Sequence, residues 1–100
     1  MYDMANIKKL KTLKELAPEA MSAFQAFDAA VFKDGALSVK VKELIAVAVA
    51  MTTQCPYCIE IHAKKAKAAG CTDAEIAEAS FVAAALRAGG AVTHATHAIG

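Results

Sequence analysis

The chain of 100 residues contains no tryptophan, only two prolines and five glycines, and three cysteines. The scarcity of proline and glycine leaves long stretches without helix breakers, which favours helices over a loop-rich fold. The odd number of cysteines, with one close pair, argues against a secreted disulfide framework. It favours a reducing, cytoplasmic setting in which a thiol pair is catalytic or binds a metal.

Neither sign of charge dominates, because 11 basic and 10 acidic residues give a formal net charge of +1. Acids and bases are interspersed, so the sequence has no basic patch for nucleic acid or an anionic membrane. The longest uninterrupted apolar run, residues 44–51, is eight residues long, whereas a membrane-spanning helix needs about 20. Residues 1–10 lack the apolar core of a signal peptide. We expect a cytoplasmic protein that binds neither nucleic acid nor membranes.

Hydrophobic residues are in surplus. They make up 57% of the chain, above the roughly 45–50% of ordinary soluble chains. A chain of this length buries only a modest core by itself, because small domains keep a large surface relative to their volume. We therefore expect one domain over residues 1–100 that buries its surplus apolar surface in a homo-oligomer.

Apolar spacing and capping signals predict an all-α, multi-helix bundle. Pro18 and Pro56 each suit the first position of a helix, and residues 72–75 form a capping box. Gly70 and the Gly89-Gly90 pair are expected to end helices. The expected helices span residues 7–16, 18–33, 38–51, 56–69, 72–88 and 91–99, with residues 52–54 as an interruption.

The apolar run at residues 44–51 would also fit a buried strand. A strand that leads into a C-x-x-C pair is the opening of a thioredoxin-like fold. That fold needs further strands and a proline near the pair, yet neither a second strand pattern nor a proline follows Cys58. The helical interpretation is therefore favoured.

The chemistry of the chain is concentrated in Cys55-Pro56-Tyr57-Cys58, which His62 follows four residues later. The pair stands at an expected helix start, where unpaired N–H groups and the helix dipole stabilise a thiolate. At steps of three and four residues, the two thiols and the imidazole would line one stripe of a helix. This pattern indicates nucleophilic thiol chemistry with His62 as the base.

Glu43 is the expected orienting partner of His62. If the helices on either side of residues 52–54 form an antiparallel hairpin, the two side chains lie at similar heights. In one continuous helix they would be about 28 Å apart, at a rise of 1.5 Å per residue. The relay from Glu43 through His62 to Cys58 is thus a hypothesis that requires a chain reversal between the two helices.

The order Glu43, eleven intervening residues, Cys55, two residues, Cys58, three residues and His62 resembles the E-x11-C-x2-C-x3-H signature of the alkylhydroperoxidase D-like group. That group belongs to the carboxymuconolactone decarboxylase superfamily, and the resemblance covers the chain from about Leu10 onward. It implies an all-α fold that assembles as trimers or hexamers. It also implies a thiol-dependent peroxidase or disulfide reductase without a bound cofactor or a metal.

The resemblance also implies a role for each site residue. Cys58 attacks the peroxide and becomes the sulfenic acid, Cys55 gives a proton and then closes the disulfide, and His62 and Glu43 relay protons. An external dithiol, either a lipoyl protein or a thioredoxin-like donor, reduces the disulfide. One position departs from the pattern: alkylhydroperoxidase D has a histidine where this chain has Tyr57, and a phenol does not replace an imidazole near neutral pH.

Two other interpretations stay open. The first is a lactone decarboxylase of the same superfamily, although those enzymes generally lack the cysteine pair. The second is a non-enzymatic structural oligomer, or a zinc site in which His62 and Glu43 complete the C-x-x-C pair.

Three further residues have candidate roles. Cys71 is expected to be a buried structural thiol. His94 and His97 stand three residues apart and could bind a metal, but a solvated or interface pair is the favoured interpretation.

Overall fold

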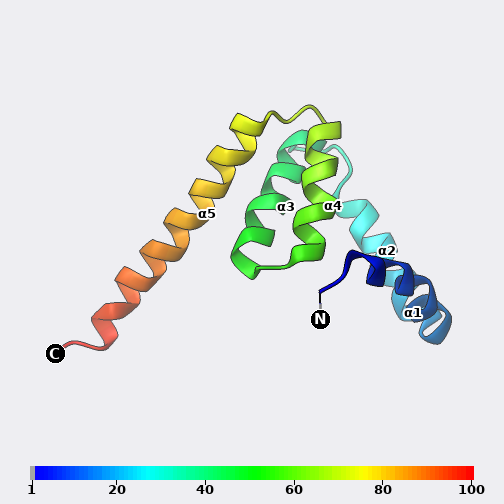
Figure 1. The fold of residues 1–100 in the computed structure, drawn as a ribbon, viewed down its shortest axis with the longest axis horizontal. Helices are drawn as coiled ribbons and strands as arrows, with labels where there is room; N and C mark the ends of the chain where they lie inside the picture. Colours follow the sequence, from blue (N-terminus) through cyan, green and yellow to red (C-terminus); the bar gives the residue numbers. More distant parts are fainter. Residues whose placement is uncertain (1) are drawn as a thin grey trace. The chain divides into compact units, whose positions relative to one another are not determined.

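The computed structural model describes residues 2–100, and Met1, the first residue of the expected domain, lies outside this range. Residues 2–100 form helices and contain no strand, which confirms the all-α fold and the helical interpretation of residues 44–51 (Figure 1). The elements are η1 (Met4–Lys9), α1 (Leu10–Leu16), α2 (Pro18–Val31), α3 (Val39–Thr53), α4 (Pro56–Ala68), α5 (Asp73–His94) and η2 (Ala95–His97), where η denotes a 3-10 helix.

The chain divides into two compact units, one that ends at Val39 and one that spans Lys40–Gly100. The first unit contains η1, α1 and α2, and the second contains the helices from α3 onward. The expectation of one domain over residues 1–100 stays a prediction.

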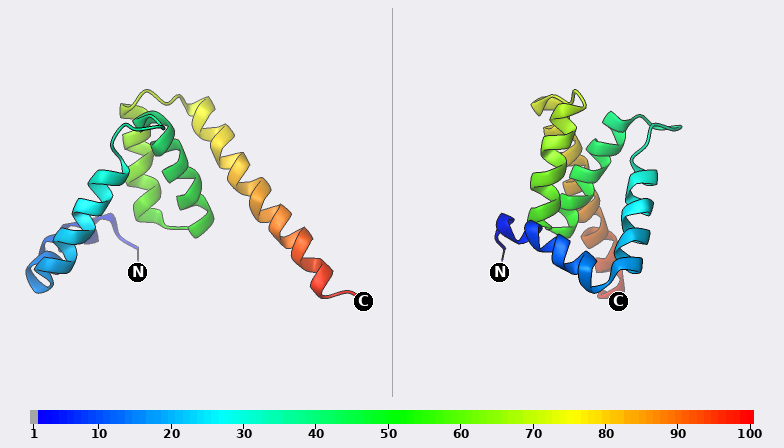
Figure 2. Two further views of the ribbon diagram at one scale, coloured as in Figure 1. Left: turned by 180° about the vertical axis from the view of Figure 1, so that it is seen from behind. Right: turned by 90° about the vertical axis from the view of Figure 1, so that its right-hand side faces the viewer.

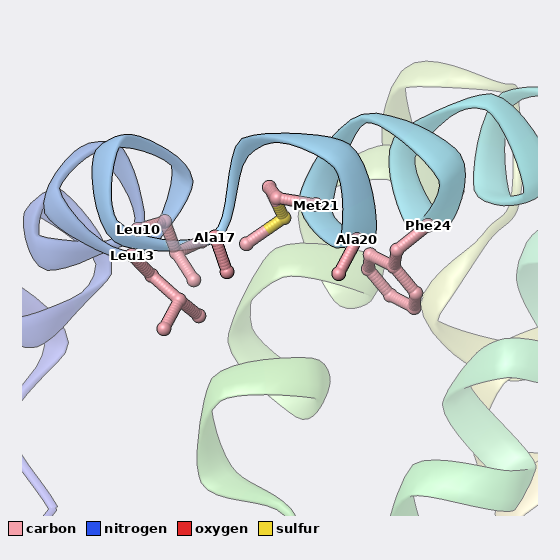
Figure 3. A pocket seen from close by; sticks show the side chains of 6 residues that line it. All are labelled: Leu10, Leu13, Ala17, Ala20, Met21 and Phe24. Carbon is pink, nitrogen blue, oxygen red and sulfur yellow. The ribbon is translucent and has the colours of Figure 1, made fainter.

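In the first unit, α1 and α2 are joined at Ala17, and Pro18 takes the first position of α2 as expected. Lys14 Nζ donates a hydrogen bond of 3.0 Å to Gln25 Oε1, which ties the two helices together. Their apolar sides line a groove of about 400 Å³, seen close up in Figure 3. Its lining consists of Leu10, Leu13, Ala17, Ala20, Met21 and Phe24.

In the second unit, α3 and α4 lie side by side and antiparallel (Figures 1 and 2). Helix α3 runs two residues beyond its expected end at Met51, and the chain reverses at Gln54, whose φ is 55°. This left-handed conformation is common just after a helix. The N–H of Cys55 donates to the carbonyl oxygen of Ala50 at 3.2 Å, which closes the turn.

The core of the second unit is small. It is a cluster of Val47, Ala66 and Cys71, against which Leu44 and Ile76 pack. Cys71 is buried, as expected, and its sulfur lies 3.6 Å from the carbonyl oxygen of Lys40. This cluster joins α3, α4 and the start of α5, so it fixes the hairpin on which the cysteine pair sits.

Helix α5 begins at the expected capping box. The N–H of Thr72 donates to the carboxylate of Glu75 at 2.8 Å, and the N–H of Glu75 donates to the hydroxyl of Thr72 at 3.1 Å. The expected break at Gly89-Gly90 is wrong, and so is the separate helix over residues 91–99, because α5 continues to His94. A glycine costs a helix only about 1 kcal/mol relative to alanine, and the alanines around the pair sustain the helix.

Large apolar side chains on α5 are exposed, with Phe81 at 76% and Leu86 at 71%. The stretch Asp73–His97 is 25 residues long and contains a window of 18 residues with a mean hydropathy of 1.2, so by length and composition alone it could cross a membrane. A helix whose apolar face packs against another subunit has the same composition.

Candidate functional site

Cys55 is the N-cap residue of α4. Its backbone is extended, with φ −91° and ψ 102°, and Pro56 follows at the first helical position. The Cys55 sulfur accepts the N–H of Cys58 at 3.3 Å, as a serine hydroxyl does at other helix starts. The expectation that Cys55 lies on the helical stripe with Cys58 and His62 is therefore wrong, because an N-cap residue stands outside the helix.

This cap geometry brings the two cysteine sulfurs together. Cys55 Sγ lies 2.7 Å from Cys58 Sγ, and both residues are free thiols. On a regular helix their Cβ atoms would stay about 5–6 Å apart. The extended conformation of Cys55 turns its side chain back over the first turn of α4, so the thiols meet without distortion of the helix.

The two thiols differ in acidity. The hydrogen bond from the Cys58 thiol lowers the pKa of Cys55, and the N–H of Cys58 and the N–H of Tyr57 lower it further. The pKa of Cys58 is raised, first because its thiol hydrogen bonds to Cys55 and then because it is buried. The pair shares one proton in its first ionised state. In that state the charge lies on Cys55 and the proton on Cys58.

His62 and Glu43 meet across the hairpin. The Nδ1 atom of His62 lies 3.1 Å from both Glu43 Oε1 and Glu43 Oε2. Glu43 is only 3% exposed, and the His62 side chain is 17% exposed. A buried carboxylate needs such a partner, since an unpaired buried charge is costly. With Nδ1–H donating to Glu43, the imidazole keeps one tautomer, in which Nε2 is the nitrogen that can accept a proton.

The structure thus places the four predicted site residues on one hairpin. Glu43 contacts His62, and Cys55 contacts Cys58, one helical turn before His62 on α4. The capping role of Cys55 was not predicted from the sequence. A cysteine directly before a proline at a helix start was the available signal, because proline favours the first helical position and leaves the preceding residue as the cap.

Other candidate residues stand apart from this group. The rings of His94 and His97 are 5.4 Å apart at the end of α5. Within residues 2–100, no three His, Cys, Asp or Glu side chains gather closely enough to hold a metal ion. The arrangement on the hairpin is suited to dithiol chemistry: two thiols in contact, one of them with a lowered pKa, and a histidine one helical turn away that contacts a carboxylate.

The similarity of this chain to known proteins extends well beyond the four site residues. The model of the "Carboxymuconolactone decarboxylase family" matches residues 18–99. A Paracoccus denitrificans protein described as "Uncharacterized protein 4 in cox locus" is 54% identical over 102 residues, which cover 99% of this chain and 92% of that protein.

Two solved structures share the fold. A protein from Methanobacterium thermoautotrophicum has a TM-score of 0.83 and 39% identity, covering 88% of this chain and 99% of that one. A carboxymuconolactone decarboxylase family protein from Legionella pneumophila, solved in an apo form, has a TM-score of 0.76 and 36% identity. That match covers 80% of this chain and 71% of the other.

Proposed function

The chain belongs to the carboxymuconolactone decarboxylase family, and from this premise we propose that it is a cytoplasmic thiol-dependent peroxidase or disulfide reductase of the alkylhydroperoxidase D-like group. The observation that carries the proposal is the contact of 2.7 Å between the sulfurs of Cys55 and Cys58. Two thiols at this distance can be converted into a disulfide by small side-chain movements. The contact between His62 and Glu43 on the same hairpin supplies an oriented base.

The reaction begins when the cysteine pair loses one of its two thiol protons to His62, and the remaining proton is shared between the two sulfurs. In the ionised pair the charge lies on Cys55, because the raised pKa of Cys58 keeps the proton there. Transfer of this proton along the sulfur–sulfur contact gives a Cys58 thiolate and a Cys55 thiol. The Cys58 sulfur then attacks the terminal oxygen of a hydroperoxide. The O–O bond breaks, Cys58 becomes the sulfenic acid, and the leaving alkoxide takes the proton from Cys55 to become an alcohol.

The second step closes the disulfide. The Cys55 thiolate attacks the sulfenic sulfur of Cys58, an S–S bond forms, and hydroxide leaves. His62 returns the proton that it accepted when the pair first ionised, so the second product is water. In sum, two thiols and one hydroperoxide give one disulfide, one alcohol and one water. An external dithiol, a lipoyl protein or a thioredoxin-like donor, reduces the disulfide by thiol–disulfide exchange.

We also propose that the working form is a homo-oligomer, a trimer or a hexamer. The exposed apolar side chains of α5 support this, because monomeric soluble proteins rarely expose large contiguous apolar patches. Light scattering at micromolar concentration is expected to give a mass of three or six chains. A stable monomer of 10.4 kDa would contradict this part of the proposal.

The first experiment is a count of free thiols before and after one equivalent of an organic hydroperoxide, with metal analysis of the same sample. We expect the loss of two thiols per chain, mapped to Cys55 and Cys58 and restored by a dithiol. A Cys71→Ala variant is the matched control, because it removes the third thiol and leaves the pair. Unreactive thiols with stoichiometric zinc would instead support a structural site, and unreactive thiols without metal would favour a decarboxylase.

A further inference from the structure

Arg87 is the only arginine in a chain whose other ten strongly basic side chains are lysines. It lies on α5, and its Nη1 donates a hydrogen bond to the carbonyl oxygen of Thr52, near the end of α3. A guanidinium differs from an ammonium in its planar fork of five N–H donors, which holds an acceptor in a fixed geometry. Arg87 therefore ties α5 to the end of α3 that leads into the cysteine pair.

The position of Arg87 on α5 is set by packing. Ile76, Ala83 and Arg87 are separated by seven and four residues, so they share one face of the helix. Ile76 packs against the core cluster, and Ala83 is only 6% exposed. Arg87 stands one turn further along the same face, where α5 is exposed. Its reach to Thr52 thus follows from the packing of α5 in the second unit.

Thr52 lies where α3 needs capping. The last carbonyl groups of a helix have no N–H partners within the helix, and here the chain reverses at Gln54. The carbonyl of Ala50 accepts the N–H of Cys55, and the carbonyl of Thr52 accepts Arg87. The end of α3 also carries a partial negative charge from the helix dipole. A cation at Thr52 offsets that charge three residues before Cys55.

We propose that Arg87 is a positioning residue for the cysteine pair: by holding the Thr52 carbonyl it fixes the turn that presents the Cys55 sulfur to the N–H of Cys58, and it offsets the negative end of α3 that opposes a Cys55 thiolate. The inference deepens the proposed function. It concerns the ionisation of Cys55 and acts through the backbone, since Arg87 is not itself placed against the reacting atoms.

The test is the pH profile of Cys55 alkylation by iodoacetamide in the full-length chain, with each modified cysteine identified by mass spectrometry. Arg87→Gln removes the charge but keeps a polar side chain, and Arg87→Lys keeps the charge. We expect Arg87→Gln to shift the Cys55 profile to higher pH and to slow labelling near pH 7 by about two- to five-fold. Arg87→Lys keeps the charge but loses the planar fork, so its profile is expected to lie between those of Arg87→Gln and the wild type.

Lys65→Met is the matched control. Lys65 is an exposed cation in the last turn of α4, about 15 Å along the helix from the cysteine pair. Its removal takes away the same unit of charge and is expected to leave the Cys55 profile unchanged. A shift as large as that of Arg87→Gln would assign the effect to net charge and would overturn the proposal.

Two further outcomes would also overturn it. One is an Arg87→Gln profile that coincides with the wild-type profile. The other is loss of the helical circular dichroism signal in both Arg87 variants, which would make the residue purely structural. The assay uses no peroxide, so it gives an answer whether or not the wild-type protein consumes hydroperoxides. A wild-type chain that failed to do so would reject the proposed function alone.

Discussion

His62 and Glu43 lie 19 residues apart in the sequence, yet Nδ1 of the imidazole is 3.1 Å from both oxygens of the carboxylate. The hairpin of α3 and α4 creates this contact, and it buries the carboxylate almost completely. In the proposed role as a base, an imidazole held in this way would keep its tautomer and orientation while protons are exchanged at Nε2.

Glu43→Gln is expected to slow hydroperoxide consumption by about 100-fold or more, the lower end of the range for general acid–base catalysis. The carboxamide keeps the shape of the side chain but removes the carboxylate whose two oxygens contact Nδ1 of His62. Steady-state assays with an excess of dithiol measure the effect. Glu78→Gln, on the exposed side of α5, is the control and should retain the wild-type rate. Equal rates in both variants would remove Glu43 from the relay.

His62→Ala should slow the reaction with hydroperoxide more at pH 6 than at pH 9. At the higher pH the thiols ionise without help, so a base contributes less. Single-turnover rates across this pH range provide the measurement, with His94→Ala as the control for loss of an imidazole elsewhere. A loss of rate that is uniform across the range would argue against a role for His62 as the base.

Cys58→Ser is expected to abolish hydroperoxide turnover, because the serine hydroxyl is a far weaker nucleophile than a thiolate. Cys55→Ser should still react once and then hold a sulfenic acid on Cys58, which dimedone traps and mass spectrometry locates. The ionised pair carries its charge on Cys55, which makes Cys55 the alternative nucleophile, so the two variants together decide which sulfur attacks. A sulfenic acid found on Cys55 in the Cys58→Ser chain would reverse the assigned roles.

The three cysteines are expected to label in a fixed order as pH rises. The lowered pKa of Cys55 means that its thiolate persists to lower pH than that of an ordinary thiol, so it reacts first. The pKa values of Cys58 and Cys71 are raised, chiefly by the hydrogen bond to Cys55 and by burial respectively, so both react only at higher pH. Mass-resolved alkylation between pH 5 and 10 gives the order, and earlier labelling of Cys71 would contradict it.

Val47→Ala should lower the free energy of unfolding by about 1–3 kcal/mol, since it removes buried methyl groups and leaves a cavity. Val47 is fully buried at the centre of the core cluster. Val49→Ala, on the same helix but 52% exposed, is the control and should cost far less. Denaturant titrations need a fixed protein concentration, because assembly also stabilises the chain. Equal losses would show that Val49 is buried by a partner subunit.

Sequence patterns predicted the features that local chemistry determines. Proline at the start of α2 and α4 and the capping box of α5 marked the helix starts correctly. The hairpin that brings Glu43 to His62 was a hypothesis from the sequence, because a break near residues 52–54 allows two helices to return alongside each other, and the structure confirms the chain reversal. The catalytic roles of these residues stay predictions.

The predictions from sequence were wrong where packing, or the backbone conformation of a single residue, determines the local structure. Gly89 and Gly90 were interpreted as a helix break. Each glycine lowers the stability of a helix only modestly, and the long alanine-rich α5 continues through both. Cys55 was assigned to a helical stripe, although one extended residue turned it into a cap. The contact between Arg87 and Thr52 joins residues 35 positions apart. Sequence periodicity carries no information about such a pair.

The capping position of Cys55 has a thermodynamic consequence for the redox cycle. The N–H groups at the start of α4 stabilise the sulfur only while it carries a negative charge, and the disulfide has no such charge. In the proposed redox cycle this stabilisation would favour the reduced pair over the oxidised one, which would raise the reduction potential of the couple and ease reduction of its disulfide by a donor thiol. In the proposed cycle, the same hydrogen bonds that lower the pKa of Cys55 would thus also favour regeneration of the dithiol.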